Sequence, residues 1–158
     1  LLSAAHCFMG IYRNTGGVVS YAAERFNHPT FGQLGNDGDI AVIRLQTPFE
    51  YSPVIQQGSI APQGFQIPDN LPVVHAGWGH TAYGGNASEV LLDTQIYTIN
   101  NELCAARYLT LPRPAIVTEN MICAGILDVG GQDACQGDSG GPLYYQDIIV
   151  GVVFNCYI

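Results

Sequence analysis

The sequence contains no lysine and few charged residues of any kind. Its 158 residues include five arginines against 13 acidic residues, and the net charge is −8. No basic stripe is available to neutralise phosphates, so we expect neither a nucleic acid nor an anionic membrane surface as a partner. Long apolar runs are also lacking: the run at 148–154 covers about seven residues, whereas a membrane-spanning helix needs about 20.

Residues that favour turns and strands are abundant: 19 glycines, nine prolines and nine tyrosines. Apolar, alternating or β-branched runs occupy residues 17–23, 40–45, 72–76, 90–99 and 142–154. Only residues 101–108 have the pattern of a short helix, with Asn at its start. Many short strands separated by Gly- and Pro-rich turns predict an all-β fold, an antiparallel barrel or sandwich.

The cysteines are odd in number, and none of the five forms a CxxC pair. A zinc ribbon or a thioredoxin-like motif is therefore disfavoured, and disulfides in an oxidising, secretory compartment are favoured. A glycosylation acceptor sequence at Asn86 is weakly consistent with secretion, although such triplets also arise by chance.

The most informative segment is Gly-Asp-Ser-Gly-Gly-Pro at 137–142. A serine among three glycines can present its hydroxyl on a tight turn whose neighbouring amides stabilise an oxyanion. A Gly-rich surface turn is the alternative. The segment also fits the G-x-S-x-G elbow of α/β-hydrolases, in which the acid and the histidine follow the serine. Here no histidine follows Ser139, and a strand-like run stands where a helix is needed, so this interpretation fails.

The chain order that fits is His, then Asp, then Ser. His6 lies in Ala-Ala-His-Cys, and Asp39 begins Asp-Ile-Ala-Val-Ile-Arg-Leu. With Ser139, these motifs resemble trypsin-like serine proteases of the chymotrypsin family, and insect gut trypsins in particular. Further matches are Asn-His-Pro at 27–29, Ala-Gly-Trp-Gly at 76–79, Met-Ile-Cys-Ala-Gly at 121–125 and Asp-Ala-Cys-Gln at 133–136.

The resemblance implies two antiparallel Greek-key β-barrels. The N-terminal barrel would cover residues 1–48 and carry the His and the Asp, an interdomain linker would cover 49–70, and the C-terminal barrel would cover 71–158 and carry the Ser. Because the interval from His6 to Asp39 is shorter than the family's, we expect the first barrel to be truncated. We expect the second to lack its last strand and C-terminal helix, so that the chain is incomplete at both ends.

The resemblance also implies the role of each site residue. Ser139 is the nucleophile, His6 is its general base, and Asp39 orients His6. The amides of Gly137 and Ser139 form the oxyanion hole. Asp138 pairs with the N-terminal amine that zymogen cleavage releases.

Asp133 matches the acid at the base of the primary specificity pocket, which selects Arg or Lys side chains; a solvated loop acid is the alternative. We therefore expect a serine endopeptidase that cleaves after Arg or Lys, without a cofactor or metal. Its partners would be protein or peptide substrates and protein protease inhibitors, and it would be a monomer.

The expected location is extracellular, in a gut lumen. Lysine loses its charge at about pH 10, which would be a disadvantage in an alkaline gut. Each lysine would also be a self-cleavage point for an enzyme of this specificity. Both disadvantages would explain the absence of lysine from the sequence. Lineage composition bias is the alternative.

The family pattern pairs Cys104 with Cys123 and Cys135 with Cys156, and it pairs Cys7 with a cysteine upstream of residue 1. His28, His75 and His80 are expected to be structural, the last two at solvent-facing or inter-strand positions, and Trp78 to be a core aromatic.

Because the activation site is absent and Phe-Asn-Cys at 154–156 replaces the family's Ser-Trp-Gly, a second hypothesis stands. It is a non-catalytic homologue that serves as a binding or regulatory module, or an inactive fragment.

Overall fold

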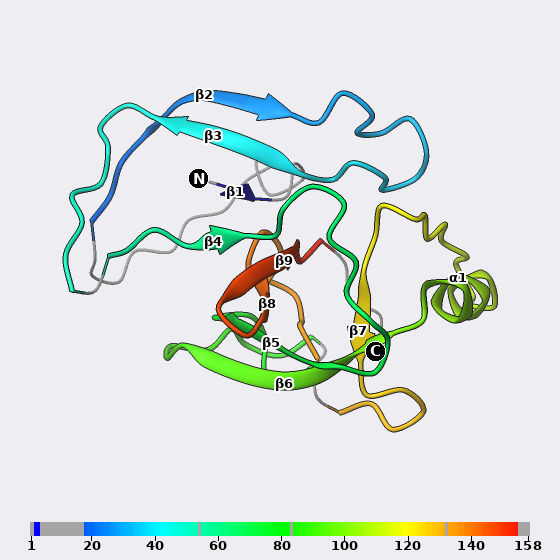
Figure 1. Cartoon of the computed structure of the whole chain (residues 1–158). Coiled ribbons are helices and arrows are strands. Elements are labelled where there is room, and N and C mark those ends of the chain that lie inside the picture. The colour runs from blue at the N-terminus through cyan, green and yellow to red at the C-terminus, as the bar shows by residue number, and fades with distance from the viewer. Residues whose placement is uncertain (1, 4–17, 54, 83, 132, 155–158) are drawn as a thin grey trace.

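Strands dominate the chain, and the described part contains one helix (Figure 1). The structure is a computed structural model that describes residues 2–3, 18–53, 55–82, 84–131 and 133–154. The strands are β1 (Leu2–Ser3), β2 (Ala22–Asn27), β3 (Ala41–Leu45), β4 (Ser59–Ile60), β5 (Pro72–Gly77), β6 (Leu92–Ile99), β7 (Cys123–Gly125), β8 (Pro142–Tyr145) and β9 (Ile148–Val152). The helix is α1 (Asn101–Leu109). This mainly β composition confirms the fold class expected from the sequence.

The N-terminal strands form a three-stranded antiparallel sheet in the order β1-β3-β2. In β3, Ala41 and Ile43 are buried while Val42 and Arg44 are exposed. This alternation follows from the two-residue period of a strand. Asp39 lies just before β3, so the buried face of this strand sets the position of the predicted catalytic acid.

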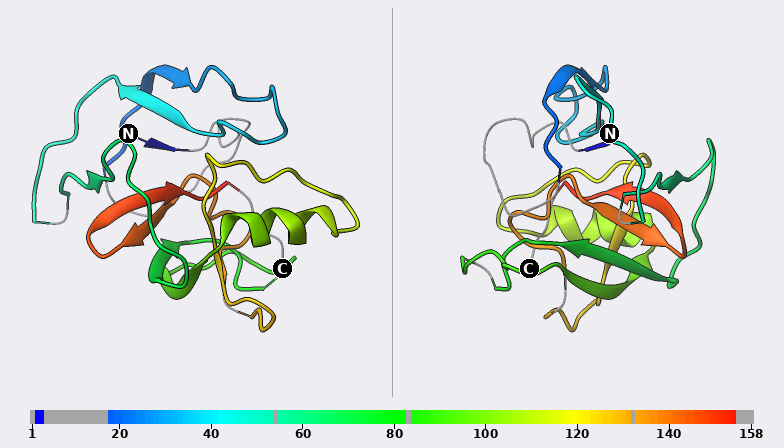
Figure 2. Two further views of the ribbon diagram at one scale, coloured as in Figure 1. Left: turned by 45° about the vertical axis from the view of Figure 1, so that its right-hand side comes forward. Right: turned by 90° about the vertical axis from the view of Figure 1, so that its left-hand side faces the viewer.

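The second sheet has six strands in the order β4-β9-β8-β5-β6-β7. Its pairs are antiparallel except for β4 with β9. Val73, Ile96 and Leu143, from the neighbouring strands β5, β6 and β8, form its buried core. Figure 2 shows the first sheet to one side of the second in both views. β5 therefore lies at the centre of the unit that carries Ser139.

Helix α1 is fixed at its start and in its middle. The Asn100 side chain accepts a hydrogen bond from the Leu103 N–H at 3.0 Å, which caps the N-terminus. A disulfide joins Cys104 of the helix to Cys123 at the start of β7, the pairing that the family resemblance implies. The helix is thereby tied to the edge of the second sheet.

Several local predictions are wrong. The strand expected at 17–23 lies at Ala22–Asn27, where hydrogen bonding to β3 decides the boundary. The single run at 142–154 is a hairpin of β8 and β9, which turns at Gln146 with a φ of 52°. Trp78 is 49% exposed rather than a core aromatic, because it follows β5 where the chain leaves the sheet.

The segment 49–70, expected as a linker, contributes β4 to the second sheet. Within the described residues, no helix has the length and apolar character needed to cross a membrane.

Candidate active site

The loop from Cys135 to Gly141 carries Ser139 into β8 and is held by its own backbone. The N–H of Asp138 donates to the carbonyl of Cys135 at 3.0 Å, and the N–H of Gly141 donates to the carbonyl of Asp138 at 2.9 Å. The N–H of Gly140 donates to the carbonyl of Val153 at 2.6 Å. This pattern makes the loop a pair of tight turns anchored on the residue after β9.

Three amides of the same loop, those of Gln136, Gly137 and Ser139, have no acceptor among the described residues, and the last two flank Asp138. Gly137 has a φ of 97°, a conformation that favours glycine. Gly137 is exposed and Ser139 is half-buried. The loop therefore combines a reachable serine hydroxyl with two unused backbone donors, the arrangement that can stabilise an oxyanion.

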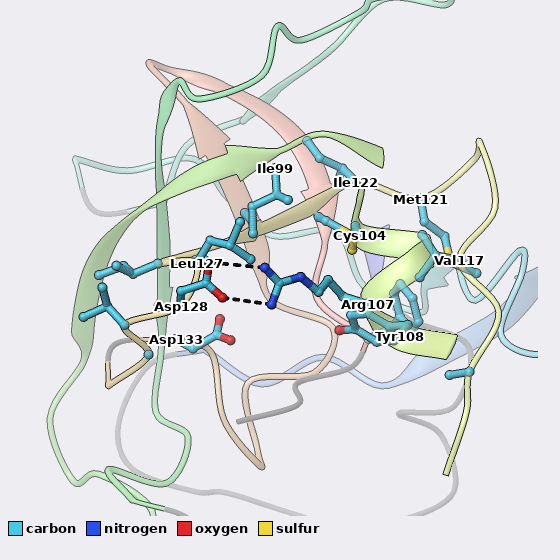
Figure 3. Close-up of a pocket in the computed structure, with 18 of the residues that line it drawn as sticks. Ile99, Cys104, Arg107, Tyr108, Val117, Met121, Ile122, Leu127, Asp128 and Asp133 are labelled. Carbon is cyan, nitrogen blue, oxygen red and sulfur yellow. Dashed lines mark hydrogen bonds and ion pairs between the residues drawn. A yellow bond between two sulfur atoms is a disulfide. The ribbon is translucent and has the colours of Figure 1, made fainter. Parts of the chain in front are cut away.

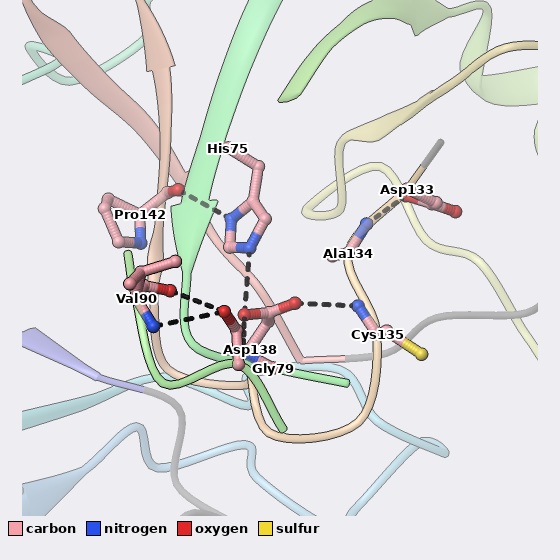
Figure 4. Close-up of polar contacts among 9 residues, drawn as sticks. His75, Gly79, Val90, Asp133, Ala134, Cys135, Asp138 and Pro142 are labelled. Carbon is pink, nitrogen blue, oxygen red and sulfur yellow. Dashed lines mark hydrogen bonds and ion pairs between the residues drawn. The ribbon is translucent and has the colours of Figure 1, made fainter. Parts of the chain in front are cut away.

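The side chain of Asp138 turns inward and fixes this loop (Figure 4). Asp138 is 9% exposed. Its Oδ1 accepts from the N–H of Gly79 at 2.8 Å, and its Oδ2 accepts from the N–H of Cys135 at 2.9 Å. A Cβ at Gly77 or Gly79 would collide with the carboxylate, so the Gly-Trp-Gly segment leaves the space that Asp138 fills.

His75 of β5 lies against the same carboxylate. It is 3% exposed; its Nδ1 is 3.1 Å from the carbonyl oxygen of Pro142, and its Nε2 is 3.4 Å from Oδ1 of Asp138. Of the two expected positions, solvent-facing or inter-strand, His75 occupies the second, because β5 pairs with β6 and β8 at this residue. The sequence reasoning missed it as part of the site. The available signal was its place two residues after Val73, on the same face of β5.

The two groups shift each other's pKa. Burial alone would lower the pKa of His75, but the contacts with Asp138 and with the Pro142 carbonyl outweigh it and raise the pKa above its usual value. Burial would raise the pKa of Asp138, but His75 and the N–H groups of Cys135 and Gly79 outweigh it and lower the pKa. Both shifts favour the charged pair.

Asp133 lies between two hollows. The larger, about 460 Å³, opens between α1 and the segment that follows it (Figure 3). The smaller, about 240 Å³, contains the His75–Asp138 pair. Asp133 is exposed, and its Oδ1 accepts from the N–H of Ala134 at 2.8 Å. Partial desolvation raises its pKa, although the Ala134 N–H and the nearby His75 act against the rise.

An ion pair occupies another part of the larger hollow. Arg107 of α1 donates to both carboxylate oxygens of Asp128, at 2.8 and 3.2 Å. Asp133, in contrast, has no ion-pair partner among the described residues. Its carboxylate is therefore available to a cationic group from outside.

Asp39 is buried, with 8% of its surface exposed, and its N–H donates to the carbonyl of Asn36 at 3.2 Å. His6 lies outside the described residues, so the assembly of the predicted triad is not described. Cys7 and Cys156 also lie outside them. Cys135 is buried, and its predicted bond to Cys156 stays a prediction.

A second buried acid near Asp39 links the two sheets. Asp37, 8% exposed, accepts hydrogen bonds from the Thr118 hydroxyl and from the Asn120 side-chain amide, the latter at 3.1 Å. These hydrogen bonds lower the pKa of Asp37 against the opposing effect of burial. The loop before β3 is thereby attached to the segment between α1 and β7.

No group of three or more His, Cys, Asp or Glu side chains in the described part of the chain is arranged to hold a metal ion.

Comparison with known proteins identifies the family of the chain. A trypsin family model matches residues 1–156. The chain is 41% identical over 164 residues to trypsin CFT-1 of Choristoneura fumiferana, covering 96% of this chain and 63% of the relative. It is 40% identical over 164 residues to alkaline trypsin A of Manduca sexta, with the same 96% and 63% coverage. It is 38% identical over 169 residues to achelase-1 of Lonomia achelous, covering 97% of this chain and 78% of the relative.

The chain therefore belongs to the trypsin family, whose fold is the chymotrypsin-type β-barrel. It spans about 63% of the length of the first two relatives.

Proposed function

We propose that the protein is a serine endopeptidase in which Ser139 is the nucleophile. The observation that carries the proposal is a pair of amides, at Gly137 and Ser139, that donate to no acceptor among the described residues, while the N–H groups at 138, 140 and 141 are engaged. The two amides belong to the half-buried serine and to the residue two positions before it. Backbone donors placed in this way are suited to a developing negative charge.

The chemistry follows from these groups together with His6 and Asp39. The Ser139 hydroxyl attacks the substrate carbonyl and transfers its proton to His6, and the former carbonyl oxygen becomes an oxyanion held by the two amides. His6 then protonates the leaving amine, and an acyl-enzyme remains on Ser139. Water, activated by His6, hydrolyses this ester and restores the serine. Asp39, buried ahead of β3, would orient the His6 ring and stabilise its charged form.

Asp133 supports a preference for Arg or Lys at the cleaved position. Its carboxylate has no ion-pair partner in the described part of the chain, and desolvation raises its pKa. A guanidinium or ammonium group from a substrate would favour the charged carboxylate, and arginine could bind in bidentate fashion.

The family also supports proposals about the protein's setting. Relatives carry the names trypsin and alkaline trypsin, and the Cys104–Cys123 disulfide is stable in an oxidising environment. We infer protein substrates, inhibition by protein protease inhibitors, a monomeric state, and secretion into an extracellular space such as a gut lumen.

The test is hydrolysis of a peptide amide with Arg at the cleaved position by the full-length protein that contains this chain. Ser139→Ala should lower kcat by roughly 10⁶-fold, because a triad serine acts as one unit with its base. His6→Ala should do the same. An unchanged rate in Ser139→Ala would contradict the proposal, and no hydrolysis by the unmodified protein would favour the non-catalytic homologue.

A further inference from the structure

The imidazole of His75 stands between two acceptors. The Pro142 carbonyl oxygen lies 3.1 Å from Nδ1, and the Asp138 carboxylate lies 3.4 Å from Nε2. The side chains of His75 and Asp138 are both more than nine-tenths buried. Little water can therefore reach the ring.

This arrangement determines where the protons of the ring lie. A carbonyl oxygen can only accept, so Nδ1 carries a proton and donates it to Pro142. If Nε2 were unprotonated, its lone pair would face the oxygen of an ionised Asp138 in a buried place, which is unfavourable. Asp138 is kept ionised by the N–H groups of Gly79 and Cys135. Nε2 has no hydrogen-bond partner among the described residues and meets Asp138 as a charge contact at 3.4 Å. A proton on Nε2 would make His75 an imidazolium and turn this contact into an attraction.

We propose that His75 is a positioning residue whose imidazolium is a built-in counter-ion for Asp138, and that it thereby orders the loop that presents the amides of Gly137 and Ser139. The role of those amides rests on the proposed function. The family resemblance assigns Asp138 a chain-terminal amine as its cation. His75 supplies a cation from the centre of the sheet, one that the chain holds before any cleavage.

The connection from His75 to the amides is short. Asp138 stands between Gly137 and Ser139 in the sequence, and its side chain fixes Gly79 and Cys135 on either side of the loop. The N–H of His80 donates to the carbonyl of Gln136 at 2.8 Å, which adds a third attachment. Loss of the positive charge would leave a buried carboxylate with hydrogen bonds but no counter-ion, and this destabilises the inward position.

Other titratable groups act on the same hollow. Asp133 and Asp138 face it from the loop, Asp93 faces it from β6, and His80 faces it from the segment after β5. The acids favour the charged form of His75, in agreement with its raised pKa. Order in the loop should therefore be greatest below the pKa of His75 and should decline as the pH rises through it.

Nuclear magnetic resonance of the full-length protein tests the ion pair without any need for activity. Loss of a signal in His75→Gln identifies the ring resonances of His75. We expect its pKa to lie above 6.5 and to fall in Asp138→Asn, where the Pro142 carbonyl and Asp133 alone oppose the effect of burial. The amide chemical shifts of Gly137 and Ser139 should change with pH at the same midpoint as His75. This pH-dependent change should be absent in His75→Gln. The proposal would be overturned if Asp138→Asn left the titration midpoint of His75 unchanged. It would also be overturned if the amide shifts of Gly137 and Ser139 had the same pH dependence in His75→Gln as in the unmodified protein.

Kinetics supply the second readout. A fluorophosphonate reacts with Ser139: Oγ bonds to phosphorus, fluoride leaves, and His6 takes the hydroxyl proton. The glutamine side chain in His75→Gln would keep a donor but carry no charge, so the rate ratio of unmodified protein to this variant should be about tenfold at pH 6, the effect of about 1.4 kcal/mol. The ratio should fall towards one as the pH rises through the raised pKa of His75. The protonation of His6 affects both proteins equally and cancels.

His80→Gln is the matched control, because His80 lines the same hollow; its ratio should not vary with pH. A His75→Gln ratio that is constant with pH would mean that His75 only fills space, and the inference would fail while the proposed function stands. No phosphonylation of any variant would refute the proposed function, and the amide titration would still decide the role of His75.

Discussion

At the scale of single residues, Asp138 determines where its neighbours lie. Its carboxylate receives two backbone N–H groups and contacts His75, and the glycines at 77 and 79 leave the space it occupies. Ser139 follows it directly. The position of Ser139, the proposed nucleophile, is thus a consequence of one buried charge and of the donors that make that charge tolerable.

Asp133 provides the sharpest test at this scale. Asp133→Ser in the full-length protein should reduce kcat/KM for Arg peptides by about 10²-fold or more, because a charge-assisted contact with the substrate is lost. Peptides with Tyr or Leu at the cleaved position should change far less. Equal losses on all three substrates would show that Asp133 is a loop acid and not a specificity residue.

The sequence alone predicted some residues and missed others for identifiable reasons. Ser139 and Asp39 are recognisable because their motifs are local. His75 was missed because its partner, Asp138, comes from a distant part of the chain, and only strand register reveals the contact. The exposure of Trp78 likewise depends on where β5 ends, a boundary that composition does not determine.

At the scale of secondary-structure elements, local patterns located the elements with strong signals. The apolar run at 40–45 corresponds to β3 at Ala41–Leu45, and the helix expected at 101–108 corresponds to α1 at Asn101–Leu109. The two-residue strand β4 was missed because its existence depends on pairing with β9. The hairpin of β8 and β9 was read as one run because Gln146, its turn residue, gives no strong turn signal.

The prediction for secondary-structure elements concerns the disulfide between α1 and β7. Cys104 and Cys123 are separated by 19 residues, and removal of such a crosslink costs about 3 kcal/mol by loop-closure entropy. The double variant Cys104→Ala/Cys123→Ala should lose about that free energy of unfolding in urea. Asn100→Ala, which removes only the helix cap, should lose about 1 kcal/mol. A double variant as stable as the unmodified protein would contradict this role of the disulfide.

At the scale of the whole molecule, the two sheets are connected through acids placed near the site. Asp37 ties the loop before β3 to Thr118 and Asn120, and Asp39 lies in the same loop. The buried Asp37 thus attaches the loop before β3 to the segment that precedes β7.

Stability should depend on pH through the His75–Asp138 pair. The raised pKa of His75 means that its contribution is complete below about 6.5 and is lost as the pH rises through the folded-state value. The lowered pKa of Asp138 means that its contribution is present above 3.8 and is lost as the pH falls through the folded-state value. The pair is therefore complete at about pH 5.5, and its contribution declines as the pH rises through the raised pKa of His75.

Urea unfolding at pH values from about 5.5 upward checks the sign. His75→Gln should cost about 1.5–3 kcal/mol at pH 5.5, the range for a hydrogen bond that involves a charged group, and clearly less once the pH exceeds the folded-state pKa of His75. A cost that grows with pH would mean that the neutral ring, not the imidazolium, is the stabilising form.

The central claim is that Ser139 is an acylated nucleophile beside two free amides. The most direct measurement is mass spectrometry of the full-length protein, quenched in acid during turnover of an ester substrate with Arg at the cleaved position. The account predicts that the mass of the acyl group appears on the peptide containing Ser139 and is absent from Ser139→Ala. An unmodified Ser139 during turnover, or an acyl group that persists elsewhere in Ser139→Ala, would contradict it.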